Sequence, residues 1–163
     1  SMKGRNPETL IAQSDEWHYQ RERVNRIYNR IANANRYMSP NKVTVNYSWK
    51  GINIKNGEFR KGKNTIYRIQ QITNFFDLRD EGSDMRHCVA SYASYCLNGK
   101  SAIFSTKQFI NGILVGREAT IEIRDGMIAQ VRGKCNRKPN DTVLAIIKEW
   151  ATYESLKMSA YSI

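Results

Sequence analysis

The fold is decided by residues 118–133, EATIEIRDGMIAQVRG. Apolar and polar residues alternate on both sides of Asp125-Gly126, and that pair is typical of a two-residue turn between antiparallel strands. We therefore predict a β-hairpin with strands over residues 118–124 and 127–132. A sheet that contains this hairpin is the first expectation for the chain.

The predicted hairpin places polar side chains on a face that is otherwise apolar. With a two-residue turn, Ile121 lies opposite Gln130, and Ala119 lies opposite Arg132. Gln130 and Arg132 then end an apolar face, and buried polar groups need partners. We therefore expect a site at this end of the hairpin. A bulged turn would shift the register by one residue and send both side chains to solvent.

Two helices and a strand are expected before the hairpin. Residues 67–80 predict an amphipathic helix that ends at Gly82. Ser83 then caps a second helix, which runs to about Leu97, and residues 101–105 form a strand. Further turn signals are Asn56-Gly57 and Asn111-Gly112.

The two ends of the chain carry helical patterns. Over residues 8–37 an apolar residue recurs at every seventh position, which predicts an amphipathic helix or helix pair. Residues 43–49 then alternate in the manner of a strand. Apolar residues between 143 and 150 predict a C-terminal helix, with Asn140 or Asp141 as its N-cap.

Together these patterns predict an α+β fold. We expect an N-terminal helical segment over residues 1–40 and an α+β core over residues 41–163, the two forming one folded unit. The core is expected to be a small, mainly antiparallel sheet with helices packed on one face and a C-terminal amphipathic helix. A chain of 163 residues fits one domain with one hydrophobic core.

The charge and the cysteine content of the chain indicate which partners and which cellular location to expect. With 26 Lys and Arg against 15 Asp and Glu, the net charge is +11, which favours a polyanionic partner such as DNA or RNA. The three cysteines have no metal-ligand spacing, and no apolar stretch is long enough for a signal peptide or a membrane span. We therefore expect a cytoplasmic protein with no membrane partner, no metal and no cofactor.

The helix expected from Ser83 holds several side chains that are capable of chemistry. His87 and Ser91 lie four residues apart on one face, while Cys88 and Cys96 lie on an adjoining apolar face. Buried, unreactive cysteines are the simplest interpretation. The functional alternatives are His87 as a general acid or base, Cys88 as a nucleophile whose pKa is lowered by the helix dipole, and a phosphate-binding helix start. Adjacent helical residues point about 100° apart, which argues against a dyad of His87 with Cys88.

A basic loop follows the hairpin. Its polar residues and its glycine are Arg132, Gly133, Lys134, Asn136, Arg137 and Lys138. Glycine permits close backbone approach and arginine binds phosphate through two hydrogen bonds, so the loop predicts an anion site. The alternative is a solvated connection. A metal nuclease site around Asp84, Glu118 and Glu122 is a weaker alternative, because acidic residues in a basic protein are usually ion-paired on the surface.

A set of residues between positions 81 and 139 forms a recognisable pattern: Glu81-Gly82, Met85, His87-Cys88-Val89, Ser91-Tyr92-Ala93, Cys96, Gly99, Ser101, Ile103-Phe104-Ser105, Ala119-Thr120-Ile121-Glu122, Gln130-Val131-Arg132-Gly133, Asn136 and Pro139. This pattern resembles the PcfJ-like proteins, which are encoded on conjugative plasmids, phages and bacterial chromosomes, and the resemblance covers about half of the chain. It implies no particular activity, although a mobile-element setting agrees with a nucleic-acid partner. The pattern emphasises His87, Cys88, Tyr92, Gln130, Arg132, Gly133 and Asn136.

Three functions follow as hypotheses. The first is a nucleic-acid-binding domain of a mobile-element or defence-associated protein, which contacts phosphates through its basic loops. The second is an enzyme that acts on a nucleotide or nucleic acid, with His87 as general acid or base and Gln130, Arg132 and Asn136 holding the substrate. This requires His87 to lie within about 10 Å of Arg132 and Asn136. The third is a protein-interaction module of a transfer or defence complex, which uses residues 8–37.

Overall fold

The computed structural model describes residue 26 and residues 48–159 of the chain. The predictions for the N-terminal helical segment, for a protein partner through residues 8–37, and for most of the strand over residues 43–49 therefore lie outside the described residues. The division of the chain at residue 40 stays a prediction.

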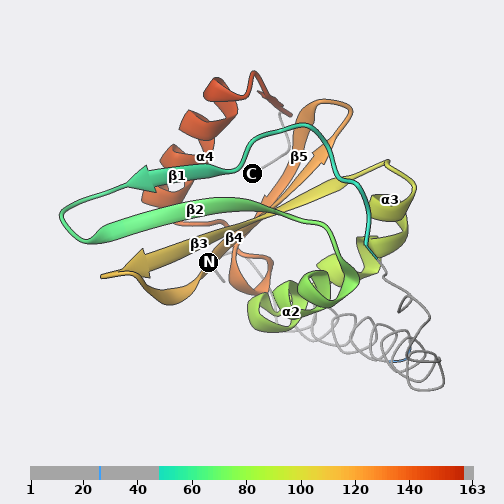
Figure 1. Ribbon diagram of the computed structural model, residues 1–163, viewed down its shortest axis with the longest axis horizontal. Coiled ribbons are helices and arrows are strands. Elements are labelled where there is room, and N and C mark those ends of the chain that lie inside the picture. Colours follow the sequence, from blue (N-terminus) through green and yellow to red (C-terminus); the bar gives the residue numbers. More distant parts are fainter. Residues whose placement is uncertain (1–25, 27–47, 160–163) are drawn as a thin grey trace, which may run out of the picture.

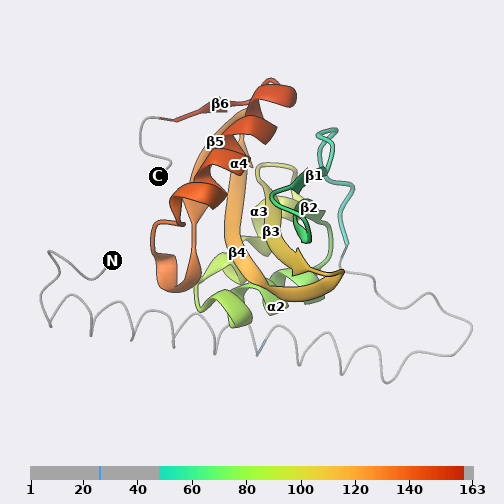
Figure 2. The same ribbon diagram turned by 90° about the vertical axis from the view of Figure 1, so that its left-hand side faces the viewer.

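A six-stranded sheet forms the centre of the described region (Figure 1). The strands are ordered in space as they are in the sequence. Every neighbouring pair is antiparallel except β5 and β6, which are parallel. The strands are β1 (Gly57–Arg60), β2 (Thr65–Ile72), β3 (Ala102–Ile110), β4 (Ile113–Arg124), β5 (Met127–Arg132) and β6 (Lys157–Met158). The helical elements are α2 (Phe75–Met85), the 3₁₀ helix η1 (Val89–Tyr92), α3 (Ala93–Leu97), the 3₁₀ helix η2 (Lys134–Asn136) and α4 (Asp141–Tyr153). The described fold is α+β, as predicted, and its sheet is curled (Figure 2).

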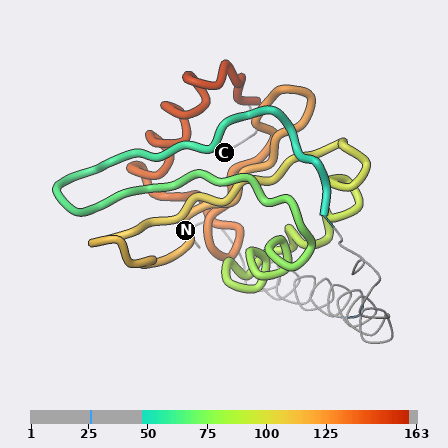
Figure 3. The backbone as a smooth tube through the Cα atoms, in the orientation of Figure 1, coloured from blue at the N-terminus to red at the C-terminus, as the bar shows by residue number. Residues whose placement is uncertain are grey.

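Two of the three predicted turns form where the sequence places them. Asp125 and Gly126 have φ angles of 53° and 72°, the left-handed values that a two-residue hairpin turn requires, and they join β4 to β5. Asn111-Gly112 joins β3 to β4 in the same way. The prediction of a turn at Asn56-Gly57 is wrong, because β1 begins at Gly57. The chain turns between Arg60 and Thr65 instead, and this turn lies beside the one between β3 and β4 (Figure 3).

Only the second half of the helix predicted over residues 67–80 forms, and the first half belongs to a strand. Residues up to Ile72 belong to β2, where Tyr67 and Ile69 point to one face of the sheet. Helix α2 begins only at Phe75, and the Asn74 side chain caps it by accepting the Asp77 amide at 2.8 Å. Pairing with β1 and β3 decides the conformation of this stretch, because contacts across a sheet override local helical periodicity.

The second predicted helix, from Ser83 to Leu97, does not form as one helix. Helix α2 continues through Gly82 and ends at Met85, because Arg86 takes a left-handed conformation with φ of 52°. The His87 amide then donates to the Gly82 carbonyl at 3.1 Å, and a Cβ on Gly82 would lie 3.1 Å from the His87 carbonyl oxygen. Gly82 therefore allows the chain to turn back closely, and His87 lies in a loop instead of on a helix.

Helices cover both faces of the sheet, which corrects the expectation of one face. Phe104 of β3 packs on Trp150 of α4, with ring centroids 4.9 Å apart, within a cluster that holds the buried residues of α4. Its neighbour Ile103 belongs to a second cluster with Leu78 of α2, Val89 of η1 and Cys96 of α3. Successive side chains of a strand point to opposite faces. We call these the α4 face and the α2 face.

A β-bulge changes the register of the predicted hairpin. Glu122 pairs with Gln130 and Thr120 pairs with Arg132, so Ala129 is an extra residue in β5. The predicted register is therefore wrong by one residue beyond the turn. Gln130 and Arg132 share the face of Thr120 and Glu122, which is the α2 face and not the apolar face.

Candidate functional site

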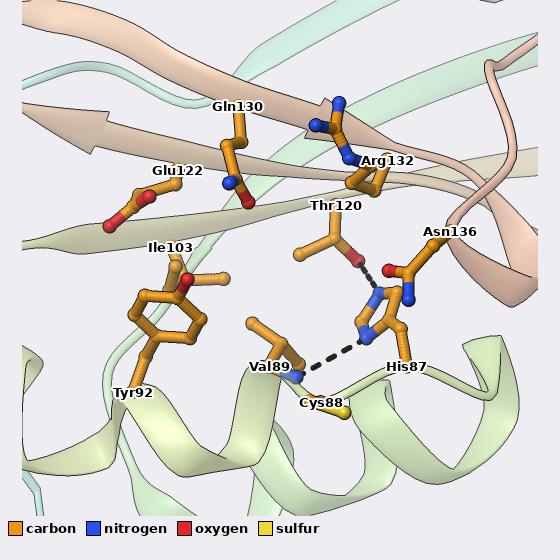
Figure 4. A pocket seen from close by; sticks show the side chains of 10 residues that line it. All are labelled: His87, Cys88, Val89, Tyr92, Ile103, Thr120, Glu122, Gln130, Arg132 and Asn136. Atoms are coloured by element: carbon orange, nitrogen blue, oxygen red, sulfur yellow. Dashed lines mark hydrogen bonds between the residues drawn. The ribbon is translucent and has the colours of Figure 1, made fainter. Parts of the chain in front are cut away.

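A cavity of about 430 Å³ lies on the α2 face, between β3, β4 and β5 on one side and the segment around η1 on the other (Figure 4). Five of the predicted site residues line it: His87, Cys88, Gln130, Arg132 and Asn136. The other lining residues are Val89, Tyr92, Ile103, Thr120 and Glu122. The bulge therefore sends Gln130 and Arg132 neither into the α4 core nor to open solvent, but to this cavity.

His87 is fixed between two hydrogen bonds. Its Nε2 lies 2.7 Å from Thr120 Oγ1, and its Nδ1 lies 3.4 Å from the amide nitrogen of Val89, which donates to it (Figure 4). The Thr120 hydroxyl donates its proton to Glu81 Oε2 at 2.5 Å, so its oxygen accepts from His87. This order places the imidazole proton on Nε2. Burial lowers the pKa of His87 to about 4, although a backbone hydrogen bond opposes the shift, so the ring is neutral at pH 7.

Glu81 is the centre of a buried polar network. Its side chain is fully buried and accepts from Ser105 Oγ at 2.7 Å and from Arg117 at 2.6 Å, besides the Thr120 hydroxyl. Arg117 also pairs with Asp84, at 2.8 Å. A buried carboxylate is tolerated when its charge and its oxygen lone pairs are both satisfied, as they are here.

Glu122 marks the other end of the cavity. Its nearly buried carboxylate accepts from Ser101 Oγ at 2.7 Å and from Arg124 at 2.8 Å. Burial, with the charge of Glu122 as the next cause, raises the pKa of Tyr92, which therefore stays a neutral phenol. Two carboxylates, Glu81 and Glu122, thus lie on the α2 face, each with a cationic partner.

Two carboxamides point toward the cavity. Gln130 descends from β5, and Asn136 approaches His87 from η2 (Figure 4). Within residues 48–159 neither side chain makes a hydrogen bond. Cys135 and Asn136 have φ angles of 58° and 60°, in the left-handed region, which asparagine adopts readily and cysteine rarely. The backbone of this pair presents the Asn136 carboxamide to the cavity.

A family model described as PcfJ-like protein matches residues 2–147. The chain belongs to the PcfJ-like family. The match extends the resemblance to the N-terminal residues and includes every residue of the cavity. No curated protein and no solved structure matches the chain.

Four predicted site residues of this PcfJ-like chain lie outside the cavity lining. Ser91 donates to the Cys88 carbonyl oxygen at 2.7 Å. The Gly133 amide donates to the Arg137 carbonyl oxygen at 2.6 Å, and a Cβ on Gly133 would lie 3.0 Å from that oxygen. The sequence predicted that Gly133 would allow an anion to approach the backbone closely. In the structure, the group that approaches Gly133 closely is the Arg137 carbonyl of the same loop. Lys134 and Arg137 are exposed beside Asn136.

The predictions based on a helix start at Ser83 lose their basis. Ser83 lies inside α2, so no helix dipole from that position favours a phosphate or lowers the pKa of Cys88. Cys96 is buried as expected, and burial, followed by the charge of Glu122, raises its pKa to about 12.

Among the described residues, no group of His, Cys, Asp and Glu could hold a metal ion, and no helix is long and apolar enough to span a membrane.

Sequence reasoning about single residues missed Glu81 and Thr120 as members of the site. Both leave a signal in the sequence. Thr120 alternates with Ala119 and Ile121, so it must lie on the opposite face of the strand. Glu81 lies three residues after Leu78, on the buried face of α2.

Proposed function

We propose that this PcfJ-like domain binds nucleic acid, that its cavity receives an unpaired nucleotide, and that the basic loop beside the cavity contacts the neighbouring phosphates. The proposal rests on Gln130 and Asn136. Each carboxamide offers donors and an acceptor toward the cavity, and neither group is used by another described residue.

The composition of the cavity suits a nucleobase. A base edge carries donors and acceptors together, and carboxamides can pair with both. The cavity also holds the Tyr92 ring and the apolar side chains of Val89 and Ile103. Aromatic and aliphatic walls with a few polar groups are typical of sites for small organic ligands, and about 430 Å³ lies in the range of such sites.

Positive charge adjoins this cavity. Lys134, Arg137 and Lys138 are exposed in the segment that carries Asn136, and the chain has a net charge of +11. Phosphates that flank a bound base would meet these side chains. The exposed turn with Arg60, Lys61 and Lys63 offers a second cationic surface.

Binding to labelled single-stranded and duplex oligonucleotides, measured by fluorescence anisotropy, tests the cavity. Gln130→Ala should weaken single-strand binding by roughly twofold to tenfold, which corresponds to one hydrogen bond of about 0.5–1.5 kcal/mol. Gln70→Ala is the matched control, because Gln70 is exposed on β2 away from the cavity. Equal affinities for both variants would refute the cavity as the binding site, and absence of binding at low salt would refute the function.

The salt dependence of binding tests the loop. The double variant Lys134→Ala/Arg137→Ala should lower the slope of log affinity against log salt concentration by about 1.4, since each lost phosphate contact contributes about 0.7 for single strands. Lys148→Ala removes an exposed charge from α4 and should leave the slope nearly unchanged. Equal slopes for the wild type and the double variant would contradict phosphate contacts by the loop.

A second candidate function is catalysis on a nucleotide or nucleic acid. It is favoured by the chain of hydrogen bonds from Glu81 through Thr120 to His87, because a carboxylate that orients an imidazole is a recurring arrangement in hydrolases. Nδ1 of His87 would then take a proton from the substrate. Turnover of an oligonucleotide that is lost in His87→Gln and kept in Gln70→Ala would establish this activity, and the absence of any product would count against it.

A further inference from the structure

We infer that Glu81 and Thr120 are positioning residues that hold the proton of the buried, neutral His87 on Nε2, and that Arg117 keeps the ring neutral by cancelling the charge of Glu81, so that the cavity offers its ligand a hydrogen-bond acceptor there. The ligand group at this end is then a neutral N–H or O–H donor, such as a base edge or a sugar hydroxyl, and not a phosphate. The part about the ligand rests on the proposed function, whereas the part about His87 does not.

The direction of each proton follows from the chemistry of Glu81. An ionised carboxylate only accepts, so both Ser105 and Thr120 donate their hydroxyl protons to it, at 2.7 and 2.5 Å. The Thr120 oxygen is left as an acceptor 2.7 Å from His87 Nε2. Because Val89 offers an amide N–H to Nδ1, the second ring nitrogen also faces a donor. Only one neutral tautomer satisfies both neighbours.

Arg117 completes this arrangement by cancelling the charge of Glu81. Its guanidinium lies 2.6 Å from Glu81 Oε1, on the oxygen that does not accept from Thr120. Without this cation, the buried carboxylate would attract a proton onto His87 through Thr120. The other charged or titratable groups that line the cavity are Cys88, Tyr92, Glu122 and Arg132, and Glu122 has Arg124 as its own partner.

The consequence for ligand recognition follows from the lone pair on Nδ1. The Val89 amide is 3.4 Å from Nδ1, which is long for a hydrogen bond, so a ligand donor can compete with it. A phosphodiester group has no proton to give at neutral pH, so its oxygens would face the lone pair of a neutral ring. Phosphates are therefore expected at the exposed basic loop, away from His87.

Nuclear magnetic resonance of the imidazole nitrogens tests the protonation state directly. The chain has two histidines, so a His18→Gln variant of the full chain leaves His87 as the only signal. We expect Nε2 protonated and Nδ1 unprotonated at pH 7, with titration only well below pH 6.5. A proton on Nδ1, rapid exchange between tautomers, or titration near pH 6.5 in this otherwise wild-type chain would overturn the inference.

Two substitutions locate the cause in this background. Thr120→Val should weaken the preference for a proton on Nε2, because only the long contact from the Val89 amide then favours it. Thr106→Val should leave the preference unchanged, because Thr106 is also buried and its Oγ1 has no hydrogen-bond partner in the described region. Arg117→Gln should raise the pKa of His87. If either Thr120→Val or Arg117→Gln folds and leaves the His87 signals unchanged, that residue does not position His87.

The ligand part is tested by adding ligands to the same sample. A single-stranded oligonucleotide or the four ribonucleosides should shift the Nδ1 signal, and dimethyl phosphate, a diester without an O–H group at pH 7, should not. A shift with dimethyl phosphate alone would overturn the assignment of a neutral donor. If oligonucleotides bind but leave Nδ1 unchanged, the proposed function stands and the inferred contact fails. If nothing binds while the tautomer is as expected, the proposed function fails and the role of Glu81, Thr120 and Arg117 stands.

Discussion

The two faces of β4 are built from adjacent residues but follow different rules. Ala119, Ile121 and Ile123 point to the α4 face, where every neighbour in the cluster is apolar or aromatic. Thr120 and Glu122 point to the α2 face, where both side chains are buried beside charges and hydroxyls. Strand β4 therefore packs against an apolar core on one face and lines a polar cavity on the other.

The comparison separates stability from recognition. On the α4 face, the stability of the fold comes from removing apolar surface from water, so the loss of stability in a variant increases with the side-chain volume that is removed. On the α2 face, a buried polar group costs free energy unless each of its hydrogen-bond partners is present. The loss of stability there depends on which hydrogen bond is broken. Groups without a partner on that face are the ones that remain for a ligand.

Removing the largest side chain of the α4 face should have the largest effect. Trp150 is 1% exposed, packs on Phe104, and donates its indole N–H to the Lys55 carbonyl oxygen at 2.9 Å. Trp150→Ala should lower the free energy of unfolding by about 3–5 kcal/mol. Urea denaturation measures this loss. Tyr153→Ala on the same helix is the control, since Tyr153 is 72% exposed and should cost much less. Equal losses would show that Trp150 is not part of a packed core.

Acid should destabilise the α2 face through His87. Its pKa is about 4 in the folded protein and 6.5 in the unfolded chain, so below pH 6.5 the unfolded state binds a proton that the folded state excludes. Stability is complete above pH 6.5 and falls as the pH drops toward 4, by about 3 kcal/mol in total. The acid-induced loss should be smaller by this amount in His87→Gln. Parallel pH profiles of unfolding for the two proteins would contradict a buried, neutral His87.

Local chemistry made one part of the fold predictable. The hairpin of β4 and β5 was predicted because its turn residues and alternation act within a few positions of each other. The stretch over residues 67–80 could not be assigned in this way, since Tyr67 and Ile69 repeat at the period of a strand while Phe75 and Leu78 repeat at that of a helix. The end of α2 was also hidden, because Arg86 takes a left-handed conformation that glycine usually supplies.

The cavity was predicted from the wrong register. Gln130 and Arg132 were expected on the apolar face of the hairpin, and the bulge at Ala129 turns them to the other face, where His87 lies. No glycine lies at this bulge, so the bulge could not be predicted from the sequence. Gln130, Arg132 and Asn136 nevertheless line one cavity with His87. It is the loop after α2, and not a helix, that brings His87 there.

A pair of isosteric substitutions compares the two faces at a smaller scale. Thr120→Val leaves Glu81 Oε2 and His87 Nε2 without a buried partner and should cost about 1–3 kcal/mol. Thr106 lies opposite Ile69 and Ala119, toward the α4 face, and its hydroxyl makes no hydrogen bond within the described residues. Thr106→Val should therefore be neutral or slightly stabilising. Thermal and urea unfolding of both variants measures the difference, and equal costs would remove the distinction between the faces.

The smallest change in stability should come from replacing Gln130, whose side chain points into the cavity and is proposed to bind the ligand. Gln130 is half-buried on β5, and its carboxamide has no partner in the described region. Gln130→Ala should therefore change the free energy of unfolding by no more than about 0.5 kcal/mol. The same variant should lose oligonucleotide affinity, whereas Thr120→Val should lose stability first. A cost for Gln130→Ala as large as that for Thr120→Val would mean that the carboxamide belongs to the internal network. In that case Asn136 alone would remain as a free carboxamide for a ligand.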